Sequence, residues 1–232
     1  MRLPPWRRKP EAARRGYDDA LLIEVIIRKT AALQGGGRRI DDVLAGETLL
    51  PTIAGIAAAG DSRPLHVLDF GGAAGLHYFV AKEAFPERDF RWAIVETPAM
   101  TAEAARFADD RLHFFTSIGD ATRWLGEIAF VHCVSALQYV PQPEATLSSL
   151  LTLDAPVLLW AKLMLGERRE AFTQVSRLRD NGPGPLPAGI ADREISYSGI
   201  RLARGDFLQA HNDARYRLAW KAAETASFLF TR

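Results

Sequence analysis

The sequence predicts an α/β fold, in which a mostly parallel sheet carries helices on both faces. From residue 65 onward, short apolar segments of strand length alternate with segments of helical periodicity, as in successive strand–helix–strand units. The first strand, 65–70, runs into a turn at 71–75 that holds three glycines, and a helix is expected over 73–85. Glycine between a strand and a helix lets a ligand approach the backbone closely. We therefore expect a small ligand against this turn.

Composition limits the class of protein. The 232 residues suffice for one α/β domain with a short appendage, and 48% hydrophobic with 25% charged residues is typical of a globular chain. A net charge of +1 gives no general attraction to nucleic acid or to an anionic membrane. Cys133 is the only cysteine, so no intrachain disulfide can form. With no apolar run near the roughly 20 residues of a membrane span and no signal-peptide core, we expect a cytoplasmic protein.

Two segments precede the expected sheet. Residues 1–15 hold five arginines and one lysine against one glutamate, which predicts either a flexible, solvated arm or a basic contact to an acidic partner, a phosphorylated substrate or the surface of a membrane. Residues 16–62 are expected to form a helical cap, with one helix over 16–33 and a second over 40–59 that Pro51 interrupts. The first helix is apolar nearly all round, so either the main domain or a second subunit should cover it, and residues 17–33 could join a homo-oligomer.

The main domain is expected over 63–232. After the first strand, further strands are predicted at 90–96, 111–116, 128–134 and 156–162, with helices that start at Pro98 and span 143–152. Two apolar stretches, 216–222 and 227–231, should close the sheet as a hairpin. The segment 163–212 interrupts this pattern with mixed and turn-rich sequence, and we expect this insertion, which carries Glu194, Tyr197 and Arg201, to form a lid over an acceptor. There are no internal repeats.

The spacing of the glycines distinguishes between ligands. The dinucleotide fingerprint needs glycines at relative positions 1, 3 and 6, but Leu76 occupies the third of these positions. The pattern that fits is Asp-x-Gly-x-Ala-x-Gly, from Asp69 to Gly75. A carboxylate at the end of the strand would attract a ligand that carries an ammonium or sulfonium group, whereas it would repel a pyrophosphate. The turn therefore favours a cationic small molecule over a dinucleotide.

This pattern resembles motif I of class I S-adenosylmethionine (SAM) methyltransferases, with Ala73 in place of the middle glycine. The resemblance implies a Rossmann-like, seven-stranded sheet that ends in a hairpin, with SAM as the cofactor and S-adenosylhomocysteine as its product. It also implies that the cofactor contacts the turn and the residues just before it. These positions are Asp69, Phe70, Gly71, Gly72, Ala73 and Gly75.

The same resemblance assigns cofactor contacts at the ends of the next strands. Glu96, followed by Thr97, closes the second strand 21 residues after Gly75, where it could accept both ribose hydroxyls; otherwise it is a surface charge. At the end of the third strand, Ser117 and Ile118 would contact the adenine.

If that strand runs further, Asp120 would take the adenine contact instead. A helix cap by Ser117 or Asp120 is the alternative, and it is compatible with an adenine contact. Cys133 and Val134, at the end of the fourth strand, should face the methionine half of the cofactor.

A narrower resemblance covers most of residues 16–220. Its residues are Gly71-Gly72-x-x-Gly75-x-x-Tyr78-Phe79, Glu96, Leu137-Gln138-Tyr139 and Ser196-Tyr197. Together they look like a bacterial family of methyltransferases with no assigned acceptor, often associated with surface-polysaccharide biosynthesis. This likeness implies acceptor contacts from Tyr78, Gln138, Tyr197 and the basic Lys162 after the fifth strand. The alternative is that Leu137 and Tyr139 are core residues and Gln138 a turn residue.

Methyl transfer to a hydroxyl requires alignment and a general base. His77 is the first candidate, since its ordinary pKa of about 6.5 suits the task; His132 and His211 follow, and Tyr139 is a second group that could reach the acceptor. No metal site is predicted, because His132 and Cys133 are adjacent and project to opposite faces of a strand.

We therefore expect SAM-dependent methyl transfer to a small-molecule or glycan acceptor, at oxygen. A catalytically silent methyltransferase fold that binds SAM or a partner protein is one alternative, and a nucleotide-dependent oxidoreductase is another. Nucleic acid is disfavoured as an acceptor, because the chain has no continuous basic stripe.

Overall fold

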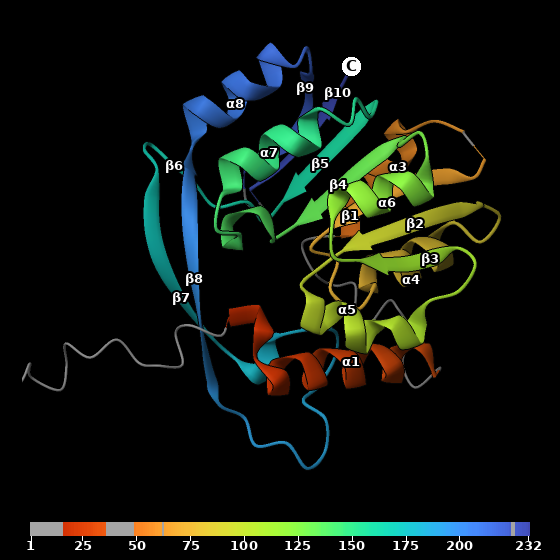
Figure 1. Cartoon of the computed structure of the whole chain (residues 1–232), viewed down its shortest axis with the longest axis vertical. Helices are drawn as coiled ribbons and strands as arrows, with labels where there is room; N and C mark the ends of the chain where they lie inside the picture. Colours follow the sequence, from red (N-terminus) through yellow and green to blue (C-terminus); the bar gives the residue numbers. More distant parts are fainter. Residues whose placement is uncertain (1–15, 36–48, 62, 224–225) are drawn as a thin grey trace, which may run out of the picture.

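The computed structural model describes residues 16–35, 49–61, 63–223 and 226–232. They form a seven-stranded sheet with helices on both faces, and a smaller three-stranded sheet lies beside it (Figure 1). The basic arm predicted at 1–15 and the first part of the second predicted helix lie outside the described residues. Within the described part of the chain, none of the helices combines the length and the apolar character that crossing a membrane requires.

The large sheet has the order β3-β2-β1-β4-β5-β10-β9. Neighbouring strands are parallel from β3 to β5, and β10 is antiparallel to both β5 and β9. The strands are β1 (Leu65–Phe70), β2 (Phe90–Val95), β3 (Leu112–Phe115), β4 (Phe130–Val134), β5 (Val157–Ala161), β9 (Arg217–Ala222) and β10 (Ser227–Thr231). The predicted α/β class, the seven strands and the closing hairpin are confirmed, and only the strand ends differ from the prediction, by up to two residues.

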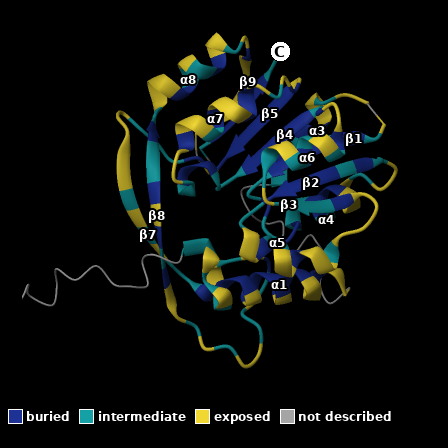
Figure 2. Ribbon diagram, in the orientation of Figure 1, coloured by how far each residue is buried: buried dark blue, intermediate teal, exposed yellow. Residues whose placement is uncertain are grey.

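Helices cover both faces of this sheet. On one face, Ile56 of α3 and Tyr78 of α4 pack with Trp92 and the other inward residues of β1 and β2. On the other face, α6, α7 and α8 pack around the buried Trp160 of β5. The helices are α1 (Ala20–Gln34), α3 (Leu49–Ala58), α4 (Leu76–Ala84), α5 (Pro98–Ala104), α6 (Ile118–Leu125), α7 (Pro143–Leu151) and α8 (Arg204–Asp213). Burial follows these layers, so that the central strands are buried and the outer faces of the helices are exposed (Figure 2).

The chain reverses direction across the sheet between β1 and β4. From β1 it proceeds outward through β2 to β3, and it then returns to β4 on the other side of β1. In open α/β sheets, ligands bind at the carboxyl ends of the strands at this kind of switch point. The glycine-rich turn follows β1, so the topology places it at the expected binding position.

Helix α1 is covered by the rest of the described chain. It follows a short turn, η3 (Gly16–Asp18), and begins after Asp19, whose carboxylate accepts the backbone N–H groups of Leu21 and Leu22 at 3.1 Å. Its apolar residues form one cluster with residues of α5 and β8. The apolar surface of α1, which either the main domain or a second subunit was expected to cover, is therefore buried within the chain.

The predicted insertion contains the small sheet. Its strands are β6 (Leu165–Gly166), β7 (Glu170–Arg177) and β8 (Glu194–Ala203), in the order β6-β8-β7. The loop between β7 and β8 is fastened to α1, because the Lys29 ammonium donates to the carbonyls of Arg179 and Asn181 at 2.7 Å. Arg193 in the same loop binds Asp19 at 2.7 Å. The insertion and the first helix thus form one continuous wall.

Candidate active site

The glycine turn adopts a backbone that only small residues tolerate. Gly71, Ala73 and Gly75 all have positive φ, at 75°, 49° and 90°. A Cβ at Gly71 would lie 2.1 Å from the Cβ of Ala136, and a Cβ at Gly72 would lie 2.4 Å from the Oδ2 of Asp69. The helix predicted to start at 73 starts instead at Leu76, because these left-handed residues cannot be helical. The turn forms a compact cradle at the carboxyl end of β1.

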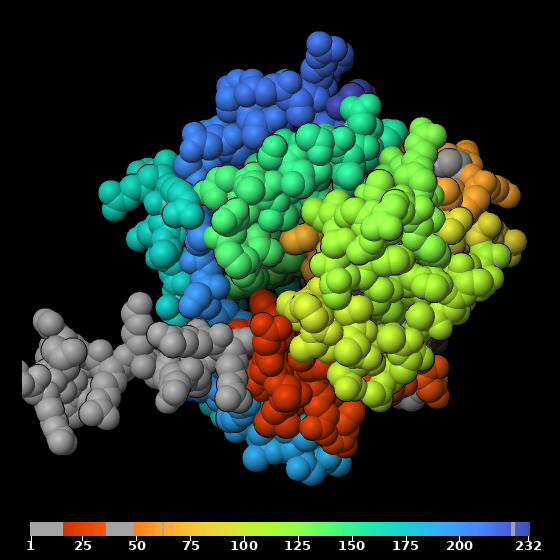
Figure 3. Space-filling model, in the orientation of Figure 1, coloured from red at the N-terminus to blue at the C-terminus, as the bar shows by residue number. Residues whose placement is uncertain are grey.

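The cradle lies largely below the surface, because Gly72, Ala74 and Gly75 are buried and only Gly71 and Ala73 are partly exposed. Figure 3 shows a hollow in the middle of this face, bordered by the red N-terminal segment, the green region of α7 and the yellow-green region of α5 and α6. A small orange area, in the colour range that includes the glycine turn, is visible inside it. Gly75, the residue before α4, has no side chain to cap the first N–H groups of that helix. The cradle thus combines a close-packed turn with a helix N-terminus.

Glu96 connects the end of β2 to the cradle. Its Oε1 accepts the N–H of Ala73 at 3.0 Å, and its Oε2 accepts the N–H of Thr97 at 2.8 Å. Burial raises the pKa of Glu96 to about 7, although the two N–H groups oppose this shift. Each carboxylate oxygen can accept a further hydrogen bond. Glu96 therefore supports the turn and keeps capacity to accept hydroxyl groups in the hollow.

Asp69 lies beneath the turn and is almost fully buried, at 1% exposed. Its Oδ1 contacts the Nδ1 of His132 at 2.8 Å, and its Oδ2 accepts the indole N–H of Trp92 at 3.1 Å. The Nε2 of His132 in turn contacts the hydroxyl of Thr52 in α3 at 2.9 Å. Burial opposes ionisation of Asp69, but the neighbouring His132 outweighs it and holds the pKa of the carboxyl below its ordinary value. Both oxygens thus have protein partners, whereas the sequence analysis expected the carboxylate to meet the ligand's ammonium group.

His77, which is half-buried, lies beside this network. Its ring lies 4.7 Å from that of His132, and burial, with the charges of His132 and Lys162, lowers the pKa of His77 to about 3. A group with that pKa is a weak base for a hydroxyl acceptor at neutral pH. The candidate base is therefore disfavoured on electrostatic grounds.

Among the described residues, Asp69, His77 and His132 form one group with metal-ligand chemistry, with ligand atoms within 4.8 Å of one another. Both ring nitrogens of His132 already have hydrogen-bond partners. The prediction of no metal site stays a prediction, and the hydrogen bonds explain the group as a buried polar network.

At the end of β3, Ser117 caps α6. Its hydroxyl accepts the N–H of Asp120 at 3.1 Å and donates to the Asp120 carboxylate at 2.7 Å. Asp120 also binds the exposed Arg123. The capping alternative is confirmed, and an adenine contact by Ser117, Ile118 or Asp120 stays a prediction.

The ends of β4 and β5 form the next part of the wall. Ser135 and Lys162, which directly follow these strands, have φ of 53° and 51°, a strained conformation for non-glycine residues. Gln138, in the turn η5 (Leu137–Tyr139), donates from Nε2 to the carbonyl of Lys162 at 3.0 Å. Its Oε1 is buried with no hydrogen-bond partner among the described residues. Such an atom is costly unless a ligand or water satisfies it.

Cys133 and Tyr78 are both buried. Burial raises the pKa of the Cys133 thiol to about 12, so the side chain is an unreactive part of the wall. Tyr78 is 1% exposed, and its ring packs against Trp92 in the core between α4 and the sheet. This position corrects the expectation that Tyr78 contacts the acceptor. His211 is fully buried on the far face, where it accepts the indole N–H of Trp160 at 2.8 Å.

Three tyrosines from distant parts of the chain meet beside the hollow. Tyr17 of η3 stacks on Tyr197 of β8 with centroids 4.7 Å apart, and Tyr139 of η5 lies 5.3 Å from Tyr17. The hydroxyl of Tyr139 donates to the Oε1 of Gln174 in β7. Burial, followed by the nearby tyrosines and Glu96, raises the pKa of Tyr17. We call Tyr17, Tyr139 and Tyr197 the tyrosine cluster.

The sequence analysis identified Tyr139 and Tyr197 but missed Tyr17, Phe172 and Gln174. Phe172 of β7 lies 6.2 Å from the ring of Tyr139. No local pattern marks these residues, because only the packing of η3 and β7 onto the sheet brings them together.

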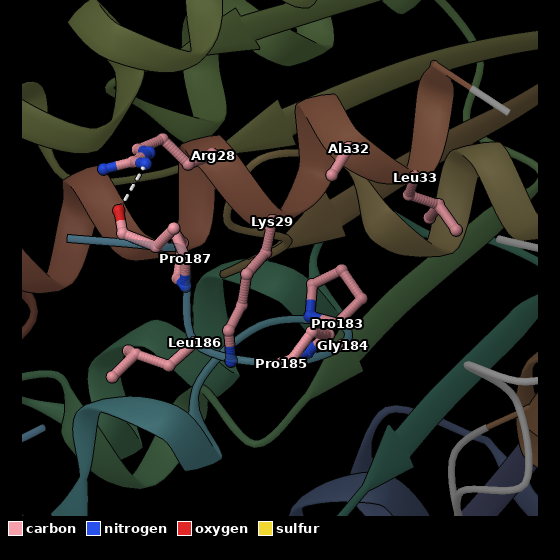
Figure 4. Close-up of a pocket in the computed structure, with 10 residues that line it drawn as sticks. Arg28, Lys29, Ala32, Leu33, Pro183, Gly184, Pro185, Leu186 and Pro187 are labelled. Atoms are coloured by element: carbon pink, nitrogen blue, oxygen red, sulfur yellow. Dashed lines mark hydrogen bonds between the residues drawn. The ribbon is translucent and has the colours of Figure 1, made fainter. Parts of the chain in front are cut away.

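Two cavities of about 360 Å³ each lie outside the hollow. One lies between α1 and the loop 183–188, where Arg28 donates to the carbonyl of Ala188 at 3.0 Å (Figure 4). Its basic residues already have partners, since Arg28 donates to the carbonyl of Ala188 and Lys29 to the carbonyls of Arg179 and Asn181. The cavity therefore lies between two segments that are packed against each other. The other lies between β6, β8, the start of α8 and the β9–β10 hairpin.

No protein-family model matches the sequence, and no curated protein is significantly similar to it. Solved structures share the fold. The chain is similar to the CcbJ methyltransferase from Streptomyces caelestis, at 12% identity over 81% of this chain and 91% of that chain, with a TM-score of 0.52. It is similar to the glycopeptide N-methyltransferase MtfA complexed with sinefungin, at 12% identity over 81% and 86% of the two chains, with a TM-score of 0.51. DesVI from Streptomyces venezuelae is similar at 14% identity over 84% and 98%, with a TM-score of 0.50. The chain therefore has a Rossmann-like methyltransferase fold.

Proposed function

We propose that this protein is a SAM-dependent methyltransferase that acts on a small-molecule or glycan acceptor. The observation that carries the proposal is the cradle at Gly71 and Gly72, at the switch point of a sheet in a chain whose fold is similar to solved methyltransferases. The fold alone does not establish the function, since one fold supports many functions. The proposal therefore rests on how well the residues of this site fit SAM.

The residues around the hollow offer what SAM requires. Gly71 and Gly72 let the turn pack closely on Ala136 and Asp69, and Glu96 has free acceptor capacity for the two ribose hydroxyls. The orphan Oε1 of Gln138, near the end of β4, is an acceptor suited to the α-ammonium group. SAM supplies an electrophilic methyl group, so the protein contributes alignment and exclusion of water. Tyr17 and Tyr139, the partly exposed members of the tyrosine cluster, are the residues best placed to orient the acceptor.

Binding should depend on pH through Glu96. Its pKa of about 7 means that the carboxyl is largely protonated at pH 6, whereas hydrogen bonds from a ribose diol favour the ionised form. The affinity for S-adenosylhomocysteine should fall roughly tenfold from about pH 8 to about pH 6. Calorimetry over this pH range tests the prediction. Glu96→Gln should bind more weakly and lose the pH dependence, and the exposed Glu83→Gln should behave like the wild type.

The acceptor atom and the pathway are narrower proposals. We place the methyl group on oxygen, because the sequence lacks the Asn/Asp-Pro-Pro-Tyr/Phe signature of many amino-group methyltransferases. A role in surface-polysaccharide biosynthesis follows from the sequence resemblance alone. Mass spectrometry of the methylated product distinguishes an ether from a methylamine, and screening should begin with nucleotide sugars and glycan intermediates.

The deciding experiment is titration calorimetry with SAM and S-adenosylhomocysteine, with NADH as the control ligand. Micromolar binding of the first two ligands, without binding of NADH, is expected. Folded protein that binds neither would overturn the proposal. Protein that binds SAM but methylates no acceptor in a broad screen would favour the alternative of a catalytically silent module.

A further inference from the structure

The second cavity, between β6, β8, the start of α8 and the β9–β10 hairpin, is lined by basic and apolar residues. Three basic side chains, Arg201, Arg204 and Lys221, share it with apolar residues, among which Leu163 and Phe228 are nearly fully buried. None of the described lining residues is acidic. We call this site the basic cavity. Its volume of about 360 Å³ is at the lower end of the range for small-molecule pockets.

Two of the three cations are uncommitted. Arg201 contacts Glu170 at 3.5 Å and lies over the ring of Phe172 at 5.3 Å. By contrast, Arg204 and Lys221 form no ion pair or hydrogen bond with another residue in the part of the chain that the structure describes. Cations that converge on one cavity repel one another, so an anion bound between them is stabilised.

The basic cavity adjoins the acceptor side of the hollow. Leu163 directly follows Lys162, whose carbonyl accepts the amide of Gln138 at 3.0 Å. On the other wall, the contacts run from Arg201 to the ring of Phe172, and from there to the ring of Tyr139, 6.2 Å away. The tyrosine cluster and the basic cavity are thus linked through adjacent residues on β7 and β8.

Strand β8 itself fixes this arrangement. Gly199 lies opposite Phe172 in the β7–β8 ladder, and a Cβ at Gly199 would lie 2.4 Å from that ring. The ring therefore rests on the strand between Tyr197 and Arg201. Figure 1 shows that β8 continues into α8, which begins at Arg204, beside the β9–β10 hairpin that carries Lys221.

We propose that the basic cavity binds a phosphate or pyrophosphate group of the methyl acceptor, while the body of the acceptor lies over Phe172 and the tyrosine cluster. Arginine and lysine together match the geometry and the charge of such a group. Arg204 and Lys221 are exposed to solvent, so their attraction for the anion weakens as the salt concentration rises. This inference rests on the proposed methyltransferase function for its acceptor, but the anion site itself can be tested independently.

The test is calorimetric titration of the full chain with inorganic pyrophosphate at low ionic strength. The double variant Arg204→Ala/Lys221→Ala should bind pyrophosphate at least tenfold more weakly than the wild type. The double variant Arg215→Ala/Arg217→Ala removes the same charge from exposed positions nearby and should bind like the wild type. No binding by the wild type, or equal weakening in both double variants, would overturn the inference.

A second titration separates this inference from the proposed function. Pyrophosphate should bind with unchanged affinity when S-adenosylhomocysteine is already present, and the Arg204→Ala/Lys221→Ala variant should bind S-adenosylhomocysteine like the wild type. Competition between the two ligands would place the anion in the cofactor hollow and overturn the inference. Pyrophosphate binding in a protein that binds no S-adenosylhomocysteine would support the anion site and count against the methyltransferase.

Discussion

Replacing Gly71 by alanine should abolish measurable binding of S-adenosylhomocysteine, with a loss of roughly a hundredfold or more. The new Cβ would lie 2.1 Å from the Cβ of Ala136, and the backbone at φ 75° disfavours any L side chain. Positive φ alone costs about 1–2 kcal/mol. The overlap must move either the turn or the segment after β4, and both of these border the hollow. Calorimetry measures the loss of binding, and urea unfolding measures the change in stability.

Two further variants separate the effect of the steric overlap from the effect of the positive φ on binding. Gly119→Ala is the matched control, because a Cβ at this position in α6 would meet no atom within 4 Å. It should preserve binding and stabilise the helix by about 0.5–1 kcal/mol. Adding Ala136→Gly to Gly71→Ala removes the overlap but keeps the unfavourable φ, so binding should be partly restored. Normal binding by Gly71→Ala alone would show that the cradle is only a structural turn.

The sheet could be predicted from the sequence because its signals are local. Apolar segments of strand length, glycine and proline at the element ends, and a terminal pair of strands are all visible in short windows. The candidate site could be predicted at the turn after β1 because the carboxyl ends of parallel strands share one edge. The tyrosine cluster could not be predicted, because residues 17, 139 and 197 meet only through tertiary packing.

The environment of Asp69 was predictable in principle. Residues 65, 67 and 69 alternate onto one face of β1, and Leu65 and Val67 are core residues on the side of α3 and α4. Asp69 pairs in register with His132 of β4, whose side chain points to the same face. The alternation thus predicts that the carboxylate lies in the core, whereas the resemblance to motif I predicted that it contacts the ligand. What the sequence could not supply is Thr52 in α3, which completes the network from a separate element.

Asp69→Ala should therefore destabilise the fold, by about 3–5 kcal/mol in the free energy of unfolding, because it leaves His132 and Trp92 without their buried acceptor. Asp69→Asn preserves the shape and one acceptor, but its amide group would face one of the two donors, so a smaller loss of about 1–3 kcal/mol is expected. Urea unfolding at pH 7 measures both changes. Because the pKa of Asp69 is depressed, its contribution is present at neutral pH and is lost only as the pH falls through that lowered pKa, below the ordinary value of 3.8.

The pair of variants also decides which role Asp69 has. If it supports the turn from below, affinity for S-adenosylhomocysteine should follow stability, so that Asp69→Asn binds better than Asp69→Ala under conditions where both are folded. A carboxylate that paired with the ligand's ammonium group would give the opposite pattern, in which Asp69→Asn loses binding as fully as Asp69→Ala and remains nearly as stable as the wild type. Since both oxygens of Asp69 already have protein partners, we expect the first pattern. The acidic residue of the motif would then act by fixing the turn and the end of β4 relative to each other.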